Sequence, residues 1–380
     1  MVEWKKMWEV TTWDKKFSGV EKTMQPKVIK YHYYLANELT ELERQEGDIR
    51  ILYTTDKVAY ANSADVEDNI SEGEVVAIPW GGNVTIKYFK GKFVTADNRI
   101  ATSNDKEILS NKFLYYWMES QKDEIGKFYR GAGIQHPSMF KVLTMQIPIP
   151  SLSEQTRIVE ILDTFTASIE NLKQQIAERR KQYEHYRDQL LDLEGKEGVE
   201  MKKLGDIGDV CMCKRIMKEQ TLEKGDVPFY KIGTFGGKAD AYISRKLFEE
   251  YKTKYSFPQK GEILLSASGT IGRKVVYNGE DAYFQDSNIV WIANNEKLVT
   301  NAFLYYVYSI IDWKVDGGTI KRLYNYNLKS AIIPVPSLQE QQRIVSILDT
   351  FEASIQNLET QLKEREKQYE YYRNKLLTFD

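Results

Sequence analysis

The side chains best suited to catalysis or metal binding are few in this sequence, and they are scattered. Its two cysteines, Cys211 and Cys213, are too close together to cross-link a domain, and no second cysteine or histidine pair completes a zinc site. The three histidines, His32, His136 and His185, are widely separated and form no persuasive set with a nucleophile. We therefore predict reduced thiols, no metal site and no catalytic residue in this chain.

Signatures of nucleic-acid enzymes are also missing. The sequence has no glycine-rich cofactor loop after a strand, no Asn/Asp-Pro-Pro-aromatic motif and no Pro-Pro pair. The tripeptide EGK at 194–196 matches a fragment of a nuclease signature, but it lacks a Pro-Asp partner and reads as linker. A self-sufficient methyltransferase or nuclease is therefore disfavoured, and we expect no cofactor in this chain.

The composition is that of a cytoplasmic globular protein with more than one domain. The chain has 380 residues, of which 42% are apolar and 28% charged, as is ordinary for soluble folds. No apolar run reaches the roughly 18 residues of a membrane span, and the N-terminus MVEWKKMWEV is too polar for a secretory signal. The net charge is −2, and only the segment 195–332 is mildly basic. Because the chain's own attraction for DNA would be weak, a basic partner is expected to supply part of it.

The strongest pattern is an internal repeat. The segments 147–194 and 333–380 align without a gap, and about 31 of their 48 positions are identical. Each begins with a capping box, Ser151-x-x-Glu154 or Ser337-x-x-Glu340, and has no later glycine or proline before the helix ends. We predict one long helix in each copy, over 151–194 and 337–380, each of about 40 residues and roughly 60 Å.

Both predicted helices carry a heptad pattern of apolar residues. The seam positions are Ile158, Leu162, Phe165, Ile169, Leu172, Ile176, Tyr183, Tyr186 and Leu190 in the first copy, with Arg179 at the polar place, and Ile344, Leu348, Phe351, Ile355, Leu358, Leu362, Arg365, Tyr369, Tyr372 and Leu376 in the second. A sustained 3.5-residue period predicts a left-handed coiled coil with a partner helix. The partner is either a second chain or the other copy within this chain, which would pair antiparallel.

The repeat extends into the segments that precede the helices. VEWKKM (2–7) matches VEMKKL (199–204), and NKFLYYWMES (111–120) matches NAFLYYVYSI (301–310). The chain therefore reads as two units, each a variable globular segment followed by a fixed helix. We predict α+β domains, with a strand, a tight glycine turn, a strand, a glycine hairpin at Gly91 and a further strand over 73–101. We also predict an Asn-Gly hairpin at Gly279 within 261–292, and each aromatic NxFLYY segment as a helix packed on the sheet.

Together these features resemble the specificity (S) subunit of type I restriction–modification enzymes. The resemblance rests on IPIPSLSEQTRIVEILDTF (147–165) and IPVPSLQEQQRIVSILDTF (333–351), on the WKKM and MKKLGDI openings, and on SASGTIGRKVVYNGE (266–280), and it covers essentially the whole chain. The first globular segment departs from the pattern, with PWGGNVTIKYFKGKF (79–93) in place of a GTIG-type turn.

The resemblance implies both a fold and a function. Two target recognition domains, at 1–150 and 195–336, would be separated by two long antiparallel coiled-coil helices with pseudo-twofold symmetry. Each domain would read one half of a split site in double-stranded DNA, and the helices would set the gap. The partners would be two modification (methyltransferase) subunits and, in the full enzyme, restriction (endonuclease/translocase) subunits, to which S-adenosylmethionine, ATP and Mg²⁺ would belong.

Base reading needs exposed polar side chains, with Arg and Lys suited to guanine and Asn and Gln to adenine. The loops GGTIKRLYNYN (317–327) and RGAGIQHPSMF (130–140) have this character, although any single surface charge is more often simply solvated. The predicted DNA contacts are Asn83, Lys87 and Lys92 on hairpin turns, together with Arg130, Gln135, His136, Lys214, Arg215, Ser268, Thr270, Arg273, Lys274, Lys321, Arg322, Tyr324 and Asn325.

The tyrosines near the helix ends allow two interpretations. Tyr183, Tyr186, Tyr369 and Tyr372 either close the coiled coil or dock modification subunits, since aromatic surface is typical of interfaces. Two near-identical docking surfaces in one chain suit two copies of one partner. A scaffold that binds only proteins is the alternative to a DNA reader at this stage.

Overall fold

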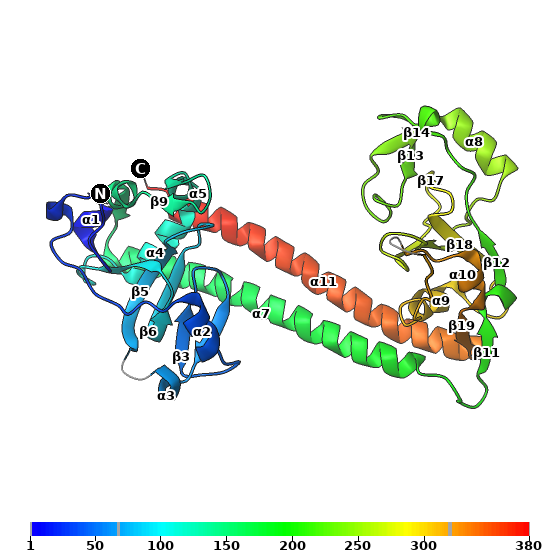
Figure 1. Ribbon diagram of the computed structural model, residues 1–380, viewed down its shortest axis with the longest axis horizontal. Coiled ribbons are helices and arrows are strands. Elements are labelled where there is room, and N and C mark those ends of the chain that lie inside the picture. Colours follow the sequence, from blue (N-terminus) through cyan, green and yellow to red (C-terminus); the bar gives the residue numbers. More distant parts are fainter. Residues whose placement is uncertain (1, 67–68, 318–320, 380) are drawn as a thin grey trace. The chain divides into compact units, whose positions relative to one another are not determined.

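The computed structural model describes residues 2–66, 69–317 and 321–379. The chain forms two compact units, Met1–Lys173 with Thr360–Asp380 (unit 1) and Gln174–Glu359 (unit 2). Each unit joins one globular part to one half of each long helix, so the predicted α+β class is confirmed in both (Figure 1). Within the described ranges, no helix combines the length and the apolar character that a membrane span requires.

Unit 1 is built on a six-stranded mixed sheet. The strand order is β2 (Thr11–Trp13), β7 (Asn98–Ser103), β5 (Ser71–Pro79), β6 (Lys87–Thr95), β3 (Ile49–Leu52) and β4 (Val58–Ala61). Smaller pairs are β1 (Glu3–Lys6) with β10 (Gln146–Ile149) and β8 (Tyr129–Arg130) with β9 (His136–Pro137). The short helices are α1 (Met7–Val10), α2 (Ala36–Leu42), α3 (Ser63–Val66), α4 (Asn111–Ser120), α5 (Lys122–Gly126) and α6 (Met139–Thr144), with a 3₁₀ turn at Lys22–Met24.

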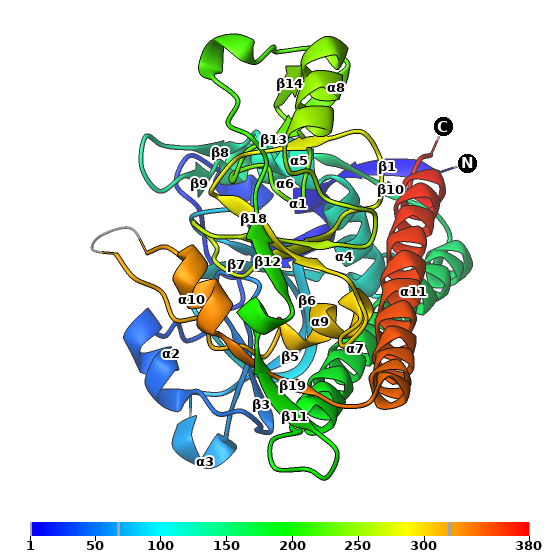
Figure 2. The same cartoon turned by 90° about the vertical axis from the view of Figure 1, so that its right-hand side faces the viewer.

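Unit 2 repeats this plan with smaller sheets. One sheet has the order β12 (Gly208–Cys211), β18 (Ile289–Asn294), β15 (Ile263–Ser266) and β16 (Lys274–Val276), and another has β14 (Ala241–Ile243), β13 (Val227–Tyr230) and β17 (Tyr283–Phe284). A further pair is β11 (Glu200–Lys203) with β19 (Ile332–Val335). The helices are α8 (Arg245–Lys254), α9 (Asn301–Val307) and α10 (Asn325–Ser330), with 3₁₀ turns at Leu204–Asp206 and Lys218–Gln220; Figure 2 shows β12 and β18 side by side.

The aromatic helices α4 and α9 cover the central strands, as predicted. In unit 1, α4 packs on β5, β6 and β7 and buries Phe113 and Tyr116; in unit 2, α9 packs on β15 and buries Phe303 and Tyr306. Each helix starts at a hydroxyl N-cap, because the side chains of Ser110 and Thr300 each accept a bond from the backbone three residues later at 3.2 Å.

Two predicted hairpins are wrong. Gly91 lies inside β6, opposite Gly73 of β5, and β6 continues to Thr95, where the chain turns to enter β7. The turn around Gly279 also joins no hairpin, since β16 pairs with β15 whereas β17 pairs in parallel with β13. In both places a local glycine signal marked conformational freedom, whereas the long-range pairing of strands decided the topology.

The two long helices are α7 (Leu152–Leu191) and α11 (Leu338–Leu376), and they pair with each other. In unit 1 the ring of Phe165 stacks on Tyr372 at 5.3 Å, and Lys173 is 3.7 Å from Glu366. Rising numbers on one helix meet falling numbers on the other, so the pairing is antiparallel. The same holds in unit 2, where Tyr186 stacks on Phe351 at 5.3 Å and Arg180 pairs with Glu359 at 2.5 Å.

The predicted capping boxes form only in part. The Ser151 and Ser337 hydroxyls accept bonds from the backbone of Glu154 and Glu340, each at 3.3 Å. The two carboxylates do not reach back to the N-cap. They form bidentate pairs one turn later, Glu154 with Arg157 at 2.6 and 2.8 Å and Glu340 with Arg343 at 2.7 and 2.8 Å.

The two thiols differ in accessibility, which predicts different reactivity. Cys213 is 2% exposed, and burial raises the pKa of its thiol to about 12, whereas Cys211 is only partly buried. Because the thiolate is the nucleophile, iodoacetamide at pH 8 is expected to label Cys211 and to spare Cys213 until the protein is unfolded in guanidinium. Fragmentation mass spectrometry separates the two sites. Equal labelling of both thiols in the native protein would contradict the buried placement of Cys213.

Candidate nucleic-acid interface

Two segments that carry predicted DNA contacts, around Ser268 and around Arg322, meet in unit 2. Ser268, in the loop after β15, forms an antiparallel bridge with Arg322, and the Leu323 amide donates to the Ala267 carbonyl at 2.9 Å. The loop 267–273 and the segment that leads into α10 therefore lie at one edge of the β15 sheet. Residues 318–320 of the predicted loop 317–327 lie outside the described residues.

A third segment, between β17 and β18, completes this cluster and was not predicted. The Ser268 hydroxyl donates to the Asn288 amide oxygen at 2.9 Å, and the Arg322 guanidinium donates to the Ser287 carbonyl at 2.6 Å. Ser287 has a φ of 54°, a left-handed conformation that residues other than glycine seldom adopt. Such tight turns at a polar edge commonly belong to functional sites, and this positive φ could not be read from the sequence.

Exposed aromatic rings flank the same edge. The rings of Tyr324 and Tyr326 are 5.8 Å apart and nearly parallel, and their side chains are 42% and 61% exposed. The Tyr326 hydroxyl and the Asn327 amide both donate to Asp316 and hold the pKa of that carboxyl below its usual value. Backbone bonds between Asp316 and Arg322, at 2.9 and 3.1 Å, close the base of the loop. Two predicted DNA contacts, Lys321 and Asn325, are exposed beside these rings.

The remaining predicted residues of unit 2 fall into two groups. Exposed Arg215 pairs with Asp286 at 2.9 Å, and the exposed Arg273 guanidinium lies 3.4 Å from the Thr270 hydroxyl; Lys214 and Thr270 are exposed as well. The ammonium of Lys274 is instead bonded to the Tyr305 carbonyl and the Ser309 hydroxyl. Burial lowers the pKa of Lys274 to about 8. A DNA contact by Lys274 would require these bonds to be exchanged.

In unit 1 the structure brings four predicted residues together. Arg130 pairs with His136 across the β8–β9 ladder, and the Gly82 amide, next to Asn83, donates to the Gln135 carbonyl at 3.1 Å. The side chains of Asn83, Arg130, Gln135 and His136 are all exposed. Amide and cationic side chains held on one surface are the chemistry that base edges require.

A buried support for this surface was not predicted. The Trp80 carbonyl is 2.7 Å from His136 Nδ1, and the Arg99 guanidinium lies 3.9 Å from the Trp80 ring. Arg99 is 3% exposed, and its Nε finds no partner among the described residues. Beside it, burial raises the pKa of Asp14, which accepts bonds from Tyr33 and the Ile100 amide. The Trp80–Arg99 contact fixes the loop that carries Asn83.

The two other predicted residues of unit 1 do not lie on hairpin turns. Lys92 lies within β6, where its side chain is exposed and its backbone lies opposite Glu72 of β5 in the antiparallel register. Lys87 begins β6, and its largely buried ammonium donates to the Tyr53 carbonyl at 2.7 Å and the Thr85 hydroxyl at 3.1 Å. The misplaced glycine hairpin at Gly91 accounts for the error, because it predicted a turn within this continuous strand.

Three of the four tyrosines proposed for partner binding contact the opposite long helix; among them, the Tyr183 hydroxyl donates to Glu352 at 3.1 Å. Tyr186 and Tyr372 stack on Phe351 and Phe165 but remain 44% and 41% exposed. Tyr183 and Tyr369 are more buried and pack against the cores of their units. The coil is therefore closed by these rings, and the exposed part of Tyr186 and Tyr372 is available to a partner.

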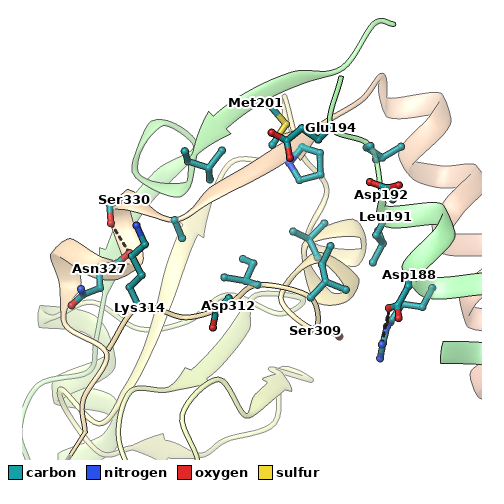
Figure 3. A pocket seen from close by; sticks show the side chains of 18 residues that line it. Asp188, Leu191, Asp192, Glu194, Met201, Ser309, Asp312, Lys314, Asn327 and Ser330 are labelled. Carbon is teal, nitrogen blue, oxygen red and sulfur yellow. Dashed lines mark hydrogen bonds and ion pairs between the residues drawn. The ribbon is translucent and has the colours of Figure 1, made fainter. Parts of the chain in front are cut away.

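A hollow of about 680 Å³ lies elsewhere in unit 2, and none of the predicted residues line it. Its wall carries four acidic side chains, Asp188, Asp192, Glu194 and Asp312, which Figure 3 shows, together with Arg187 and Lys314. Its net charge is therefore mildly negative, which does not favour phosphate. Within the described residues, no group of three or more His, Cys, Asp or Glu side chains could hold a metal ion.

A family model and two relatives of known name point to the same family. The model of the type I restriction modification DNA specificity domain matches the chain twice, over residues 11–179 and 196–367. A putative type I restriction enzyme specificity subunit of Haemophilus influenzae is 46% identical over 86% of this chain and 90% of the relative. The EcoR124I/EcoR124II specificity subunit of Escherichia coli is 31% identical over 77% and 76%.

Solved structures with low identity share the fold. An S subunit of a type I restriction-modification system from M. genitalium aligns with a TM-score of 0.65 at 17% identity, over 100% of this chain and 97% of that one. A chain from structural work on the assembly and conformational transition of the type I R-M system aligns with a TM-score of 0.55 at 15% identity, over 100% and 98%.

Proposed function

Because the chain belongs to the family of type I restriction–modification DNA specificity subunits, we propose that its two globular parts each read one half of a bipartite DNA site. Sequence specificity, and not catalysis, is the role of this family. The internal duplication carries the proposal: the two helix segments share about 31 of 48 residues, whereas the loops of the globular parts differ far more. A common frame with two unlike polar surfaces suits two unlike half-sites.

The recognition surfaces we assign are the cluster around exposed Asn83 and Gln135 in unit 1 and the cluster around half-buried Ser268 and Arg322 and exposed Tyr324 in unit 2. Supporting this assignment, each cluster combines amide or cationic donors with aromatic rings on loops that a buried scaffold fixes. Lys92, Arg130, His136, Lys214, Arg215, Thr270, Arg273, Lys321 and Asn325 complete the set, whereas Lys87 and Lys274 would contact DNA only from their half-buried positions.

The long helices have two roles in this proposal. As a continuous antiparallel pair, they set the non-specific gap between the half-sites, and their exposed Tyr186 and Tyr372 rings, backed by Tyr183 and Tyr369, dock two modification subunits. The repeat supports the second role, since two matching surfaces bind two copies of one partner. In domain terms, we assign 1–150 and 195–336 as the recognition domains, and 151–194 and 337–380 as the segments that contain the long helices.

The chain works inside a larger complex with DNA and other subunits. We assign S-adenosylmethionine to the modification subunits, and ATP and Mg²⁺ to the partner subunits in a complex that includes restriction subunits. Because we propose that the complex acts on cellular DNA, we assign the chain to the cytoplasm. A partner that supplies positive charge also fits the net charge of −2.

Methylome sequencing of a host strain before and after deletion of this gene tests the proposal. The expected result is loss of one split motif that carries N6-methyladenine in both halves. Reintroducing the gene should restore the same motif. If every methylated motif survives the deletion, the reading role fails and a scaffold that binds only proteins takes its place.

Single substitutions should change one half-site at a time. Gln135→Ala removes an exposed amide from the unit 1 cluster, and a lost bidentate base contact costs about 1–3 kcal/mol of discrimination. We expect relaxed specificity at one position of one half-site, with the other half and the gap unchanged, measured by methylome sequencing. Gln342→Ala, an exposed glutamine on α11, is the matched control. Relaxation in both halves would contradict the assignment of one half-site to each unit.

A further inference from the structure

A pocket of about 310 Å³ in unit 1 has an excess of positive charge. Four cations line it, Arg50, Lys57, Lys87 and Lys112, whereas its described wall holds a single carboxylate, Asp56. The lining comes from β3, β6, α4 and α7, together with the loop after β3. We refer to it as the Lys87 pocket.

Lys87 is the cation that this pocket leaves least compensated. Its largely buried ammonium donates to two neutral oxygens, the Tyr53 carbonyl at 2.7 Å and the Thr85 hydroxyl at 3.1 Å. Among the described residues, no carboxylate lies within ion-pair distance of it. Burial lowers the pKa of Lys87 to about 8, against a weaker opposing attraction from Asp56. A buried charge without a counter-ion is costly, and an incoming anion would remove that cost.

The other three cations divide into paired and unpaired groups. Lys57 lies 2.5 Å from Glu43, and Lys112 lies 3.2 Å from Asp163. The Arg50 guanidinium lies 5.2 Å from the Tyr60 ring and has no ion-pair partner within the described ranges. Arg50 and Lys87 therefore carry the positive charge that the protein itself leaves unneutralised.

Unit 2 holds the counterpart of this pocket, and its charge is opposite. Tyr115 and Tyr116 line the Lys87 pocket, and Tyr305 and Tyr306, their matches in the repeated FLYY segment, line a pocket of about 620 Å³. The lysine there, Lys274, shares the described wall with three carboxylates, Glu296, Asp349 and Glu352.

Two differences between the repeats account for part of this contrast. Lys112 of α4 corresponds to Ala302 of α9, and Thr166 of α7 corresponds to Glu352 of α11. Both differences make the unit 1 pocket more positive. Because the surrounding helices are otherwise closely similar, the positive charge is specific to unit 1 and not a property of the shared frame.

We propose that the Lys87 pocket binds a phosphate of the DNA backbone, held by Lys87 and Arg50. The inference rests on the proposed function, because it supplies unit 1 with a sequence-independent anchor. A phosphate provides the anion that both cations lack, and a volume of about 310 Å³ also accommodates the attached sugar. Unit 2, whose pocket is acidic, has no equivalent anchor at this place.

The test measures the affinity of the assembled complex, this chain with its modification partner, for two duplexes across a range of salt concentrations. One duplex contains the methylated motif and the other a scrambled one. Lys87→Met is expected to weaken binding to both by the same factor, roughly tenfold at 50 mM salt, and to reduce the slope of log K against log salt by about 1. The motif that the complex methylates should not change.

Two further variants keep the result interpretable. Arg50→Met removes the second cation and should lower the salt slope by a similar amount, which covers the case in which Lys87→Met fails to fold. Lys363→Met removes an exposed lysine of α11 that lies outside the Lys87 pocket and outside the assigned DNA contacts, and it should leave the slope unchanged. A wild-type salt slope in both Lys87→Met and Arg50→Met would overturn the phosphate anchor. The proposed function would still stand in that case if the methylated motif were unchanged.

Two other outcomes would also overturn the proposal. Inorganic phosphate or a mononucleotide is titrated against the complex without DNA. If either binds in a Lys87-dependent manner while the salt slope of DNA binding keeps its wild-type value, the pocket holds a free phosphate ligand instead. Weaker assembly with the modification partner, combined with a normal DNA slope, would identify an acidic protein segment as the occupant. Survival of every methylated motif after deletion of the gene would instead indicate failure of the proposed function.

Discussion

Replacing Gln341 by alanine is expected to lower the free energy of unfolding by about 3 kcal/mol, because three hydrogen bonds of a fully buried side chain are lost together. The Gln341 amide donates to the Leu298 carbonyl at 2.8 Å and the Pro336 carbonyl at 2.9 Å, and its oxygen accepts from the Thr300 amide at 2.9 Å. Thr300 is the N-cap of α9, so one side chain ties the start of α11 to the start of the aromatic helix.

The repeat contains the same arrangement a second time. Gln155 donates to the Ile108 carbonyl at 2.8 Å and the Pro150 carbonyl at 2.9 Å, and accepts from the Ser110 amide at 2.9 Å. Both glutamines have no exposed surface. Gln155→Ala should therefore destabilise unit 1 as Gln341→Ala destabilises unit 2.

Chemical denaturation of each variant measures the effect, and amide hydrogen exchange locates it. Exchange of the Ser110 amide should accelerate in Gln155→Ala, and that of the Thr300 amide in Gln341→Ala. Gln342→Ala is the matched control: its side chain is exposed one residue further along α11, and its change should stay within about 0.5 kcal/mol. Equal stability of Gln341→Ala and Gln342→Ala would show that the buried network contributes little.

Deleting one heptad from each long helix should shorten the gap of the recognition motif by about three base pairs. Removing 169–175 from α7 and 355–361 from α11 keeps the seam in register, since Ile176 then replaces Ile169 and Leu362 replaces Ile355. Seven helical residues span roughly 10 Å, and B-form DNA rises about 3.4 Å per base pair. Modification at the original motif should be lost.

Methylome sequencing of a strain whose only copy of the gene encodes the deletion variant detects both the loss of the original motif and the appearance of a motif with a shorter gap. The two half-sites should keep their sequences, because the loops that face bases are untouched. A deletion of four residues from each helix is the control: it breaks the heptad, so loss of the complex is expected instead of a new motif. If the seven-residue deletion retains the original gap, the helices do not set the spacing.

The long helices could be predicted from the sequence almost to the residue. Predicted over 151–194 and 337–380, they are observed as Leu152–Leu191 and Leu338–Leu376. The heptad, the capping serines and the lack of internal glycine are local signals, and local backbone bonds make a helix. The same logic succeeded for the aromatic segments at α4 and α9.

Strand pairing and the sites were less accessible to sequence reasoning. The predicted hairpins at Gly91 and Gly279 do not exist, because strands join partners that are distant along the chain. The Gln155 and Gln341 networks were hidden for the same reason: the PSLxEQ segment was recognised as a helix start, but its glutamine reaches a loop more than 40 residues earlier.

The duplication is legible in the amino-acid sequence alone: the helical frame is repeated, the two globular parts have diverged, and the family follows from both. The folded chain was needed to show which loops meet, that Ser287 and Asn288 join Ser268 and Arg322, and that the Lys87 pocket and the pocket lined by Lys274 are opposite in charge. The difference lies in the range of the interactions. Periodicity and capping act within a few residues and are written in consecutive letters. A buried charge or a polar cluster depends on residues that only folding brings together.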